Sequence, residues 1–156
     1  MAQPRSDGTP YGAFNFRVTA ENFGGADSIT AGFQEISGLG MEVTIADYRA
    51  GNSLENHVRH VPGLHKVNDV TLKRGVIGVT DLFTWIKSVS DGEAIAQQPK
   101  TVTIELRDET GHNTVMTWTL SGAIPKSYKG ATLNAKGGTD VAIEELVLSV
   151  EGILTS

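Results

Sequence analysis

Hydrophobic and polar residues alternate over two neighbouring segments of this chain, and this pattern constrains its fold more than any other feature. The alternation runs over residues 101–107 and returns over residues 115–120. Successive side chains of a β-strand point to opposite faces, so a period of two predicts strands with one buried face. Turn-forming residues fill the stretch from Asp108 to Asn113 between them. The two segments therefore predict an antiparallel hairpin.

Five further segments carry strand patterns. These expected strands span residues 14–20, 29–36, 41–48, 67–75 and 140–152. A Gly-Gly turn within residues 22–28 is expected to join the first two strands into a hairpin. In the last strand, the early hydrophobic residues are out of phase with the later ones, which predicts a bulge near Glu144 and Glu145.

One helix is expected, from a cap at Thr80 to about Ser90. Threonine is a favourable N-cap residue, and Asp81 places a negative charge in the first turn, where the helix dipole favours it. The residues predicted to share the buried face are Leu82, Phe83, Ile86 and Val89. Trp85 lies beside this stripe, so it is expected at the edge of the core or in an interface.

The order of these elements predicts the fold class. Strands and helices do not alternate, so the chain is expected to be mainly β, an antiparallel β-sandwich or barrel with one flanking α-helix. With 156 residues, 18 of them glycine, the chain suits one core with many turns. Residues 1–13 are expected to be a flexible N-terminal arm, and residues 14–156 the β-sandwich domain.

Composition excludes several classes of function. The net charge of -5 argues against specific nucleic-acid binding, which depends on a basic surface. The chain has no cysteine, so disulfides and thiolate sites are excluded. No apolar run approaches the roughly 20 residues that span a membrane, and residues 1–8 are polar, without the apolar core of a signal peptide. The protein is therefore expected to be made in the cytoplasm.

Two groups of polar residues could in principle support chemistry. His57, His60 and His65 are close in sequence, as metal ligands are, but no carboxylate stands at a matching spacing, so no metal site is expected. Glu144 and Glu145 are adjacent, and neighbouring strand residues point to opposite faces, so they are expected to be surface charges or subunit contacts. The sequence therefore predicts no catalytic residue, no cofactor and no enzyme activity.

The alternation stops over residues 49–63. Loops of about 12 to 15 residues without their own structure are uncommon in compact domains unless they are functional or disordered. This segment is therefore the first candidate for a contact surface.

Short motifs spread along most of the chain resemble one protein family. In the first half they are Gly32-Phe33-Gln34-Glu35-Ile36-Ser37-Gly38-Leu39, Tyr48-Arg49-Ala50-Gly51-Asn52, Val61-Pro62-Gly63-Leu64 and Thr71-Leu72-Lys73-Arg74-Gly75. In the second half they are Trp118-Thr119-Leu120, Leu133-Asn134-Ala135, Val141-Ala142-Ile143-Glu144 and Glu151-Gly152. Together and in this order, they resemble the T4-like virus tail-tube protein family of contractile phage tails and related injection particles.

The resemblance implies a structural role. Six subunits are expected to form a ring, and rings to stack into a hollow tube that a contractile sheath drives through a target envelope. The implied partners are other copies of the chain, the sheath protein, baseplate or hub and terminator proteins, and cargo in the lumen. The protein is then expected to be made in the bacterial cytoplasm and to become part of a phage tail or a tail-like particle. A similar architecture is expected in the type VI secretion tube protein.

Subunit contacts are expected at the signature residues of the candidate loop and at one basic pair. Gly51, Asn52, Pro62 and Gly63 are expected to shape the loop, and Arg49 and Arg59 to pair with acidic groups of a neighbour. The full set of expected interface residues is Arg49, Gly51, Asn52, Arg59, Pro62, Gly63, Leu64, Lys73 and Arg74. The alternative is a monomeric β-sandwich that serves such a particle as a binding or adhesin module.

Replacing Gly51 by Val is expected to block tube formation and to leave a folded subunit, because the loop would lose its shape. Electron microscopy of the purified variant checks this expectation. Tubes indistinguishable from those of the unchanged protein would contradict it.

Overall fold

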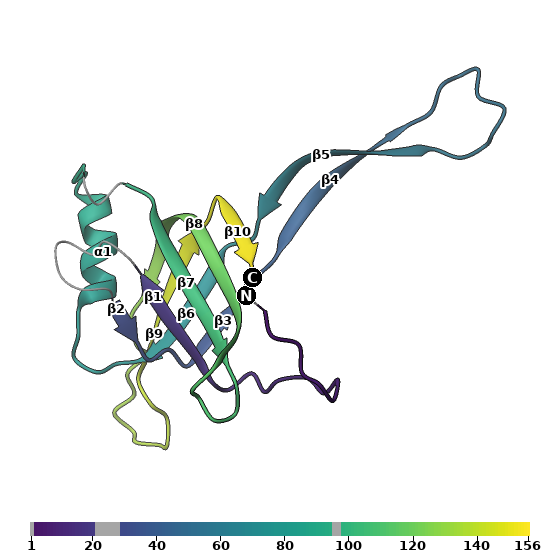
Figure 1. The fold of residues 1–156 in the computed structure, drawn as a ribbon. Coiled ribbons are helices and arrows are strands. Elements are labelled where there is room, and N and C mark those ends of the chain that lie inside the picture. The colour runs from purple at the N-terminus through teal and green to yellow at the C-terminus, as the bar shows by residue number, and fades with distance from the viewer. Residues whose placement is uncertain (1, 21–28, 95–97) are drawn as a thin grey trace.

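The computed structural model describes residues 2–20, 29–94 and 98–156. Within this part of the chain, the regular structure is antiparallel β-sheet with one helix, α1 (Asp81–Ser90), on its flank (Figure 1). The strands are β1 (Phe16–Ala20), β2 (Ile29–Ala31), β3 (Glu35–Ser37), β4 (Met41–Tyr48), β5 (Arg59–Val67), β6 (Val70–Gly75), β7 (Lys100–Arg107), β8 (Thr114–Lys129), β9 (Ile143–Ser149) and β10 (Gly152–Thr155).

Eight of the strands form one antiparallel sheet that curls on itself. Its hydrogen-bonded order is β2-β1-β7-β8-β9-β6-β3, and β10 also pairs with β8. The two ends of this order, β2 and β3, are joined by residues 32–34 alone, so the sheet must bring its ends close together. The Gln34 backbone N–H also donates to the Lys73 carbonyl at 2.7 Å. The predicted fold class, mainly antiparallel β with one flanking helix, is confirmed.

The alternating residues pack the core as the period of two predicts. The predicted hairpin is formed by β7 and β8, which place Ile104 opposite Trp118 across the turn at residues 108–113. Along β6, buried residues alternate with partly exposed ones. The buried core residues of the barrel include Val18, Val70, Leu72, Val102, Ile104, Leu120, Leu146 and Leu148.

Helix α1 closes one side of this core through a face that agrees in part with the predicted one, since Leu82 is buried and Val89 packs against the core. Leu82 and Trp85 are buried, at 3% and 4% exposure, whereas Phe83 is 47% exposed. Trp85 is therefore a core residue. Thr80 occupies the N-cap position without a capping hydrogen bond from its side chain. No helix among the described residues is long and apolar enough to cross a membrane.

Three of the predicted strands have different boundaries in the structure. The strand expected over residues 29–36 is split, because β2 pairs with β1 and β3 pairs with β6 at the other end of the sheet. The strand expected over residues 67–75 is interrupted between β5 and β6. The bulge near Glu144 and Glu145 was wrongly predicted, since both residues pair in register with β6 and Val141 lies before β9 with 73% exposure. The turn predicted within residues 22–28 lies outside the described residues.

Arg74 on β6 ties the helix to the barrel. The prediction that it reaches a neighbouring subunit is wrong, because its side chain is 2% exposed and points inward. Its guanidinium pairs with Glu144 of β9 and with Asp81 of α1, and donates to the Val79 carbonyl at 3.2 Å. The Tyr128 hydroxyl donates to the second oxygen of Glu144 at 2.8 Å.

These contacts determine the direction in which the pKa of Arg74 is shifted. Burial by itself lowers the pKa of Arg74, but the hydrogen bonds to Asp81 and Glu144 outweigh it and raise the pKa above its ordinary value. Glu144, expected at the surface, is 5% exposed and is the buried partner of this cation. The network therefore holds β6, β9 and α1 together, with the single Arg74 cation in contact with both carboxylates.

Replacing Arg74 by Met should lower the free energy of unfolding by about 3–5 kcal/mol, because the buried Glu144 and the partly buried Asp81 would be left without a cation. Lys73→Met is the matched control, since Lys73 lies next along β6 and makes a 3.7 Å surface pair with Glu35. That pair should contribute less than about 1 kcal/mol. Urea unfolding of dilute subunits, followed by tryptophan fluorescence, measures both values. Equal stabilities of the two variants would contradict this role of Arg74.

Gly38, between β3 and β4, occupies a site that no other residue fits. Its φ is 88°, and an added Cβ would lie 2.1 Å from the Asp69 carbonyl oxygen. Gly51 has ordinary backbone geometry, and a Cβ there would meet no atom within 4 Å. Gly38→Ala should therefore cost more than about 1 kcal/mol of stability, and Gly51→Ala almost none. Urea unfolding compares the two variants. An unchanged free energy of unfolding for Gly38→Ala would show that the turn relaxes to accept the added Cβ.

Candidate subunit-assembly surface

Strands β4 and β5 form a hairpin that projects from the barrel, and residues 41–67 are called the projecting hairpin below (Figure 1). Every residue of β4 is exposed, as is every residue of β5 except Val67. A ribbon of two strands without a packed face is marginally stable in water. The projecting hairpin therefore has no core of its own within the subunit.

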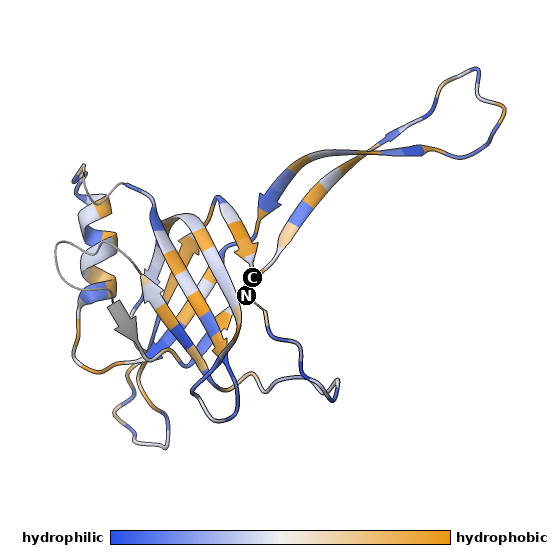
Figure 2. Ribbon diagram, viewed as in Figure 1, coloured by the Kyte–Doolittle hydropathy of each residue, from blue (hydrophilic) through white to orange (hydrophobic). Residues whose placement is uncertain are grey.

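One face of this ribbon is hydrophobic. Met41, Val43 and Ile45 alternate along β4 with exposures of 53%, 48% and 52%, and Pro62 lies opposite Ile45. Figure 2 shows the hydrophobic segments on this strand beyond the edge of the barrel. These four residues are called the apolar face below. Clustered hydrophobic side chains of this kind mark interaction sites on soluble proteins.

The other face of the ribbon is mostly polar and charged. Glu42 lies opposite Lys66, and Tyr48 opposite Arg59, in the cross-strand register. Opposite charges and aromatic residues at such positions stabilise a strand pair by a few tenths of a kcal/mol to about 1 kcal/mol. This face therefore supports the pairing of β4 with β5, and the apolar face remains without a partner.

The structure corrects the long loop predicted over residues 49–63. Strand β5 begins at Arg59, so the irregular segment is limited to residues 49–58. Pro62 and Gly63 lie in β5 and not in the predicted loop, because a proline is compatible with an edge position and both strands of this ribbon are edges. The register shifts between Val43 and Ile45, where Gly63 and Leu64 lie opposite Thr44 as a β-bulge.

Gly63 lies at the closest approach of the two strands in this bulge. A Cβ at this position would lie 3.2 Å from the Thr44 carbonyl oxygen, tighter than most such contacts. The neighbouring Leu64 is left 86% exposed. The motif Pro62-Gly63-Leu64 thus bends the ribbon and presents a leucine to the outside.

Residues 49–58 form the tip of the projecting hairpin. The Ser53 backbone N–H donates to the Ala50 carbonyl at 3.0 Å, which closes a turn around Gly51 and Asn52. The Arg49 guanidinium donates to the carbonyls of Glu55 and Ser53, each at 3.3 Å. The tip is thus organised by backbone acceptors, and the positive charge of Arg49 faces no carboxylate in this segment.

The three histidines of this region do not converge. His60 Nδ1 lies 2.8 Å from an oxygen of Asp47, and His57 Nε2 lies 3.2 Å from an oxygen of Glu55. His65 faces Val43 across the ribbon. Within residues 2–20, 29–94 and 98–156, no group of three or more potential ligands could hold a metal ion.

The expected interface residues separate into two places. Seven of the nine lie on the projecting hairpin, namely Arg49, Gly51, Asn52, Arg59, Pro62, Gly63 and Leu64. Lys73 and Arg74 lie on β6 of the barrel and are already paired within the subunit. A subunit contact through the first seven residues stays a prediction.

Sequence reasoning missed the hydrophobic part of this surface. The alternation of Met41, Val43 and Ile45 correctly predicted a strand. The prediction that one face of this strand is buried failed, because every residue of the strand is exposed. Leu54, at the tip, is fully exposed and was also missed. The available signal was that this strand is followed by a segment with Pro and Gly instead of by a clear second core strand.

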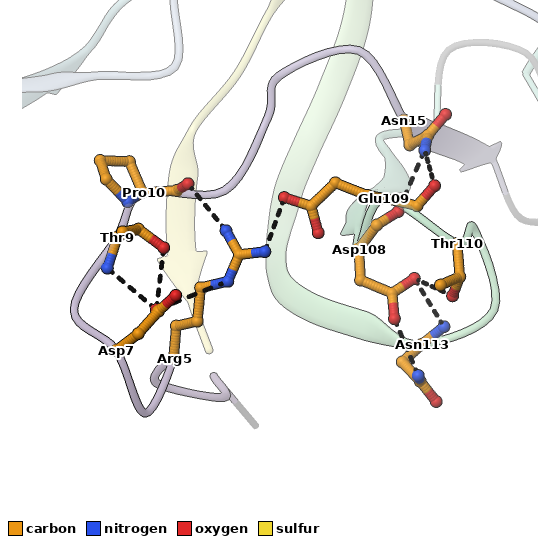
Figure 3. A network of polar contacts seen from close by, with 9 residues as sticks. All are labelled: Arg5, Asp7, Thr9, Pro10, Asn15, Asp108, Glu109, Thr110 and Asn113. Atoms are coloured by element: carbon orange, nitrogen blue, oxygen red, sulfur yellow. Dashed lines mark hydrogen bonds and ion pairs between the residues drawn. The ribbon is translucent and has the colours of Figure 1, made fainter.

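The N-terminal segment makes a second, polar surface against the β7–β8 turn (Figure 3). Arg5 pairs with Glu109 at 3.0 Å, and its Nη1 donates to the Pro10 carbonyl at 3.1 Å. The Gln3 backbone N–H donates to the Val115 carbonyl of β8 at 2.9 Å. Residues 2–13 thus contact the barrel without forming a helix or a strand, and their flexibility stays a prediction.

Asp108 organises the turn that this segment contacts. Its carboxylate accepts hydrogen bonds from the Thr110 hydroxyl at 2.7 Å and from the Asn113 amide at 2.8 Å. These two bonds hold the pKa of Asp108 well below its usual range. The carboxylate is therefore charged at neutral pH and serves the conformation of the turn.

Several solved structures have a shape similar to that of this chain. A protein of the sheath-tube complex of the extracellular contractile injection system PVC is 28% identical, with 94% of this chain and 91% of that chain covered and a TM-score of 0.78. A protein of the anti-feeding prophage baseplate is 27% identical, with 95% and 96% covered and a TM-score of 0.81. Hcp1 from Flavobacterium johnsoniae is 12% identical, with 92% and 95% covered and a TM-score of 0.58, and shares the fold.

The family comparison spans nearly the whole chain. No curated protein sequence matches it. The model of the family described as T4-like virus tail tube protein gp19 matches residues 12–154. The chain therefore belongs to the T4-like virus tail tube protein gp19 family and is a structural subunit of the inner tube of a contractile phage tail or phage-tail-like particle.

Proposed function

We propose that six copies of this chain form a ring and that rings stack into a hollow tube inside a contractile sheath. The observation that carries the proposal is the projecting hairpin, whose apolar face is not covered by any of the described residues of the subunit. The similar baseplate protein comes from a six-fold symmetrised structure, which supports the number of copies.

Burial of the apolar face supplies part of the assembly energy. Full burial of a Val, Ile or Met side chain is worth about 1.5–3 kcal/mol, and these side chains are about half exposed in the subunit. Covering Met41, Val43 and Ile45 should therefore contribute about 3 kcal/mol at each contact. Every subunit repeats the contact, so small contributions add up along a tube.

Association of subunits would also provide hydrogen-bond partners for backbone groups at one edge of the barrel. Among the described strands, β10 pairs with β8 alone, so its other edge carries unpaired N–H and C=O groups. Exposed strand edges attract further strands. A strand from a neighbouring copy at this edge would carry backbone hydrogen bonds across the subunit boundary and stiffen the wall of the tube.

Each of the two contacts joins one surface of a copy to a different surface of its neighbour, so both contacts are heterologous. They close into a ring when the rotation between copies permits it, and otherwise they continue as a filament. A ring held by one contact and a stack held by another give a tube. The projecting hairpin extends well beyond the barrel, so it suits the contact that reaches another copy (Figure 1).

The partners and the setting follow from the same proposal. The similar proteins come from a sheath-tube complex, a baseplate, and a sheath and tube terminator at 28% identity and a TM-score of 0.78. We assign the chain partners of the same kinds: a sheath protein, a baseplate protein and a terminator. The chain has a structural role and no catalytic one, it is made in the bacterial cytoplasm, and cargo passes through the lumen that it lines.

Negative-stain electron microscopy of purified protein tests the function directly. Six-membered rings or hollow tubes are the expected result. A monomer that stays monomeric at high concentration, and whose melting temperature rises with a bound ligand, would instead favour a binding or adhesin module.

Val43→Asp should abolish rings and tubes while leaving a folded subunit. Val43 is half exposed, so the fold loses little, but in the assembled contact the new carboxylate would be buried without a partner. Thr44→Asp is the matched control, because it places the same charge next along β4 on the opposite face. Sedimentation measures assembly, and circular dichroism measures folding. Normal tubes from Val43→Asp would exclude the apolar face as the contact.

A further inference from the structure

A hollow lies at the end of the barrel away from the projecting hairpin. The loop of residues 130–142, which connects β8 to β9, lies at the lower left of Figure 1, and the projecting hairpin extends to the upper right. The hollow has a volume of about 450 Å³ and is lined by Thr132, Leu133, Asn134, Gly137, Gly138, Asp140, Val141, Ala142 and Ile143. A cavity of about 150 Å³ already accommodates benzene, so this one has room for a large side chain.

The lining combines hydrophobic side chains with one charge. Leu133 and Val141 are 84% and 73% exposed, which leaves apolar surface open to solvent at the hollow. Among the described residues that line it, Asp140 is the charged one. No cation of the described chain lies within ion-pair distance of this carboxylate. The hollow therefore suits an apolar group that carries a positive charge beside it.

The tip of the projecting hairpin has these properties. Leu54 is completely exposed at its end. Arg49 and Arg59 stand at the two ends of the irregular segment, and neither forms an ion pair with a carboxylate among the described residues. Strand β4 has eight residues, so the ribbon extends roughly 25 Å at about 3.3 Å per residue. The tip is thus carried away from its own barrel and toward another copy.

We propose that Leu54 of one copy enters the hollow of residues 130–142 of the next copy along the tube, and that Arg59 pairs there with Asp140. The inference rests on the proposed function, and it names the surface that receives the projecting hairpin. The occupant is a second copy because the tip of the projecting hairpin and the loop of residues 130–142 lie at opposite ends of the described subunit, so one cannot reach the other within the same copy (Figure 1). A head-to-tail contact between two such surfaces repeats without limit along one direction.

Charge complementarity fixes the partner and the direction. The hairpin tip carries Leu54 between Arg49 and Arg59 in the sequence, and the hollow carries Asp140 with Leu133 and Val141, so hydrophobic and charged groups match in one orientation. Burial of an apolar side chain supplies the attraction, while the ion pair at the rim selects the correct register. The reverse pairing, tip against tip, would place arginines of both copies together.

Cysteine cross-linking tests the contact, because the chain contains no native cysteine. Leu54→Cys and Leu133→Cys are combined in one chain, tubes are assembled and oxidised, and non-reducing electrophoresis separates the products. Disulfides form only when the Cα atoms approach within about 4.4–6.8 Å. A ladder of covalent multimers is expected from the double variant and from neither single variant. Both positions are exposed, so the subunit fold is unaffected.

A matched control pairs Leu54→Cys with Ile77→Cys. Ile77 is 71% exposed and hydrophobic, and it lies between β6 and α1, outside the residues that line the hollow. Tubes that form a ladder through Ile77 and not through Leu133, or that form none, would overturn the inference while leaving the proposed function intact. Absence of tubes from the unchanged protein would overturn the proposed function itself.

A charge exchange provides a second readout. Arg59→Asp and Asp140→Arg should each lower the fraction of protein that sediments as tubes several-fold, because each places like charges together. The combined variant should recover most of that loss. Recovery supports the pairing, and additive losses in the combined variant would exclude it.

Discussion

The projecting hairpin cannot bury its apolar face within its own subunit, and this constraint shapes the whole molecule. Two strands have only edges, and their hydrophobic side chains gain nothing until a third surface covers them. Met41, Val43 and Ile45 stay about half exposed, while comparable side chains in the barrel are almost completely buried. A chain that keeps such a ribbon is adapted to association with further copies, and the tail-tube family provides that setting.

The barrel supplies the rigid support that the hairpin lacks. Its core strands carry aliphatic side chains with little or no exposure, and Arg74 connects β6, β9 and α1 through Glu144 and Asp81. A buried cation with satisfied partners constrains the relative positions of three elements, although its net effect on stability can be small. Gly38 then allows β3 to turn closely past Asp69 into β4. The backbone geometry at the base of the hairpin therefore helps to set its direction.

Prediction from sequence succeeded where one face of a strand meets the core. Residues 101–107 and 115–120 form a hairpin because burial and pairing both reinforce the period of two. It failed where that signal is ambiguous. Pro62 and Gly63 suggested a loop, yet an edge ribbon tolerates a proline and uses the glycine in a bulge. Arg74 and Glu144 looked like surface charges, because nothing in a linear pattern shows that two charged residues seventy positions apart will neutralise each other in the interior.

By itself, the sequence determined the class of the protein: a mainly antiparallel β fold with one helix, and, through motifs in a specific order, membership of a tube-forming family. Local periodicity and turn residues act over a few positions, so they can be read without coordinates. Only the tertiary structure decided that the β4 strand leaves the barrel, that Trp85 and not Phe83 faces the core, and that Leu54 and the loop of residues 130–142 lie at opposite ends. The physical reason is that burial depends on which distant segments pack together, and the same alternating pattern serves equally well against the subunit's own core or against another copy.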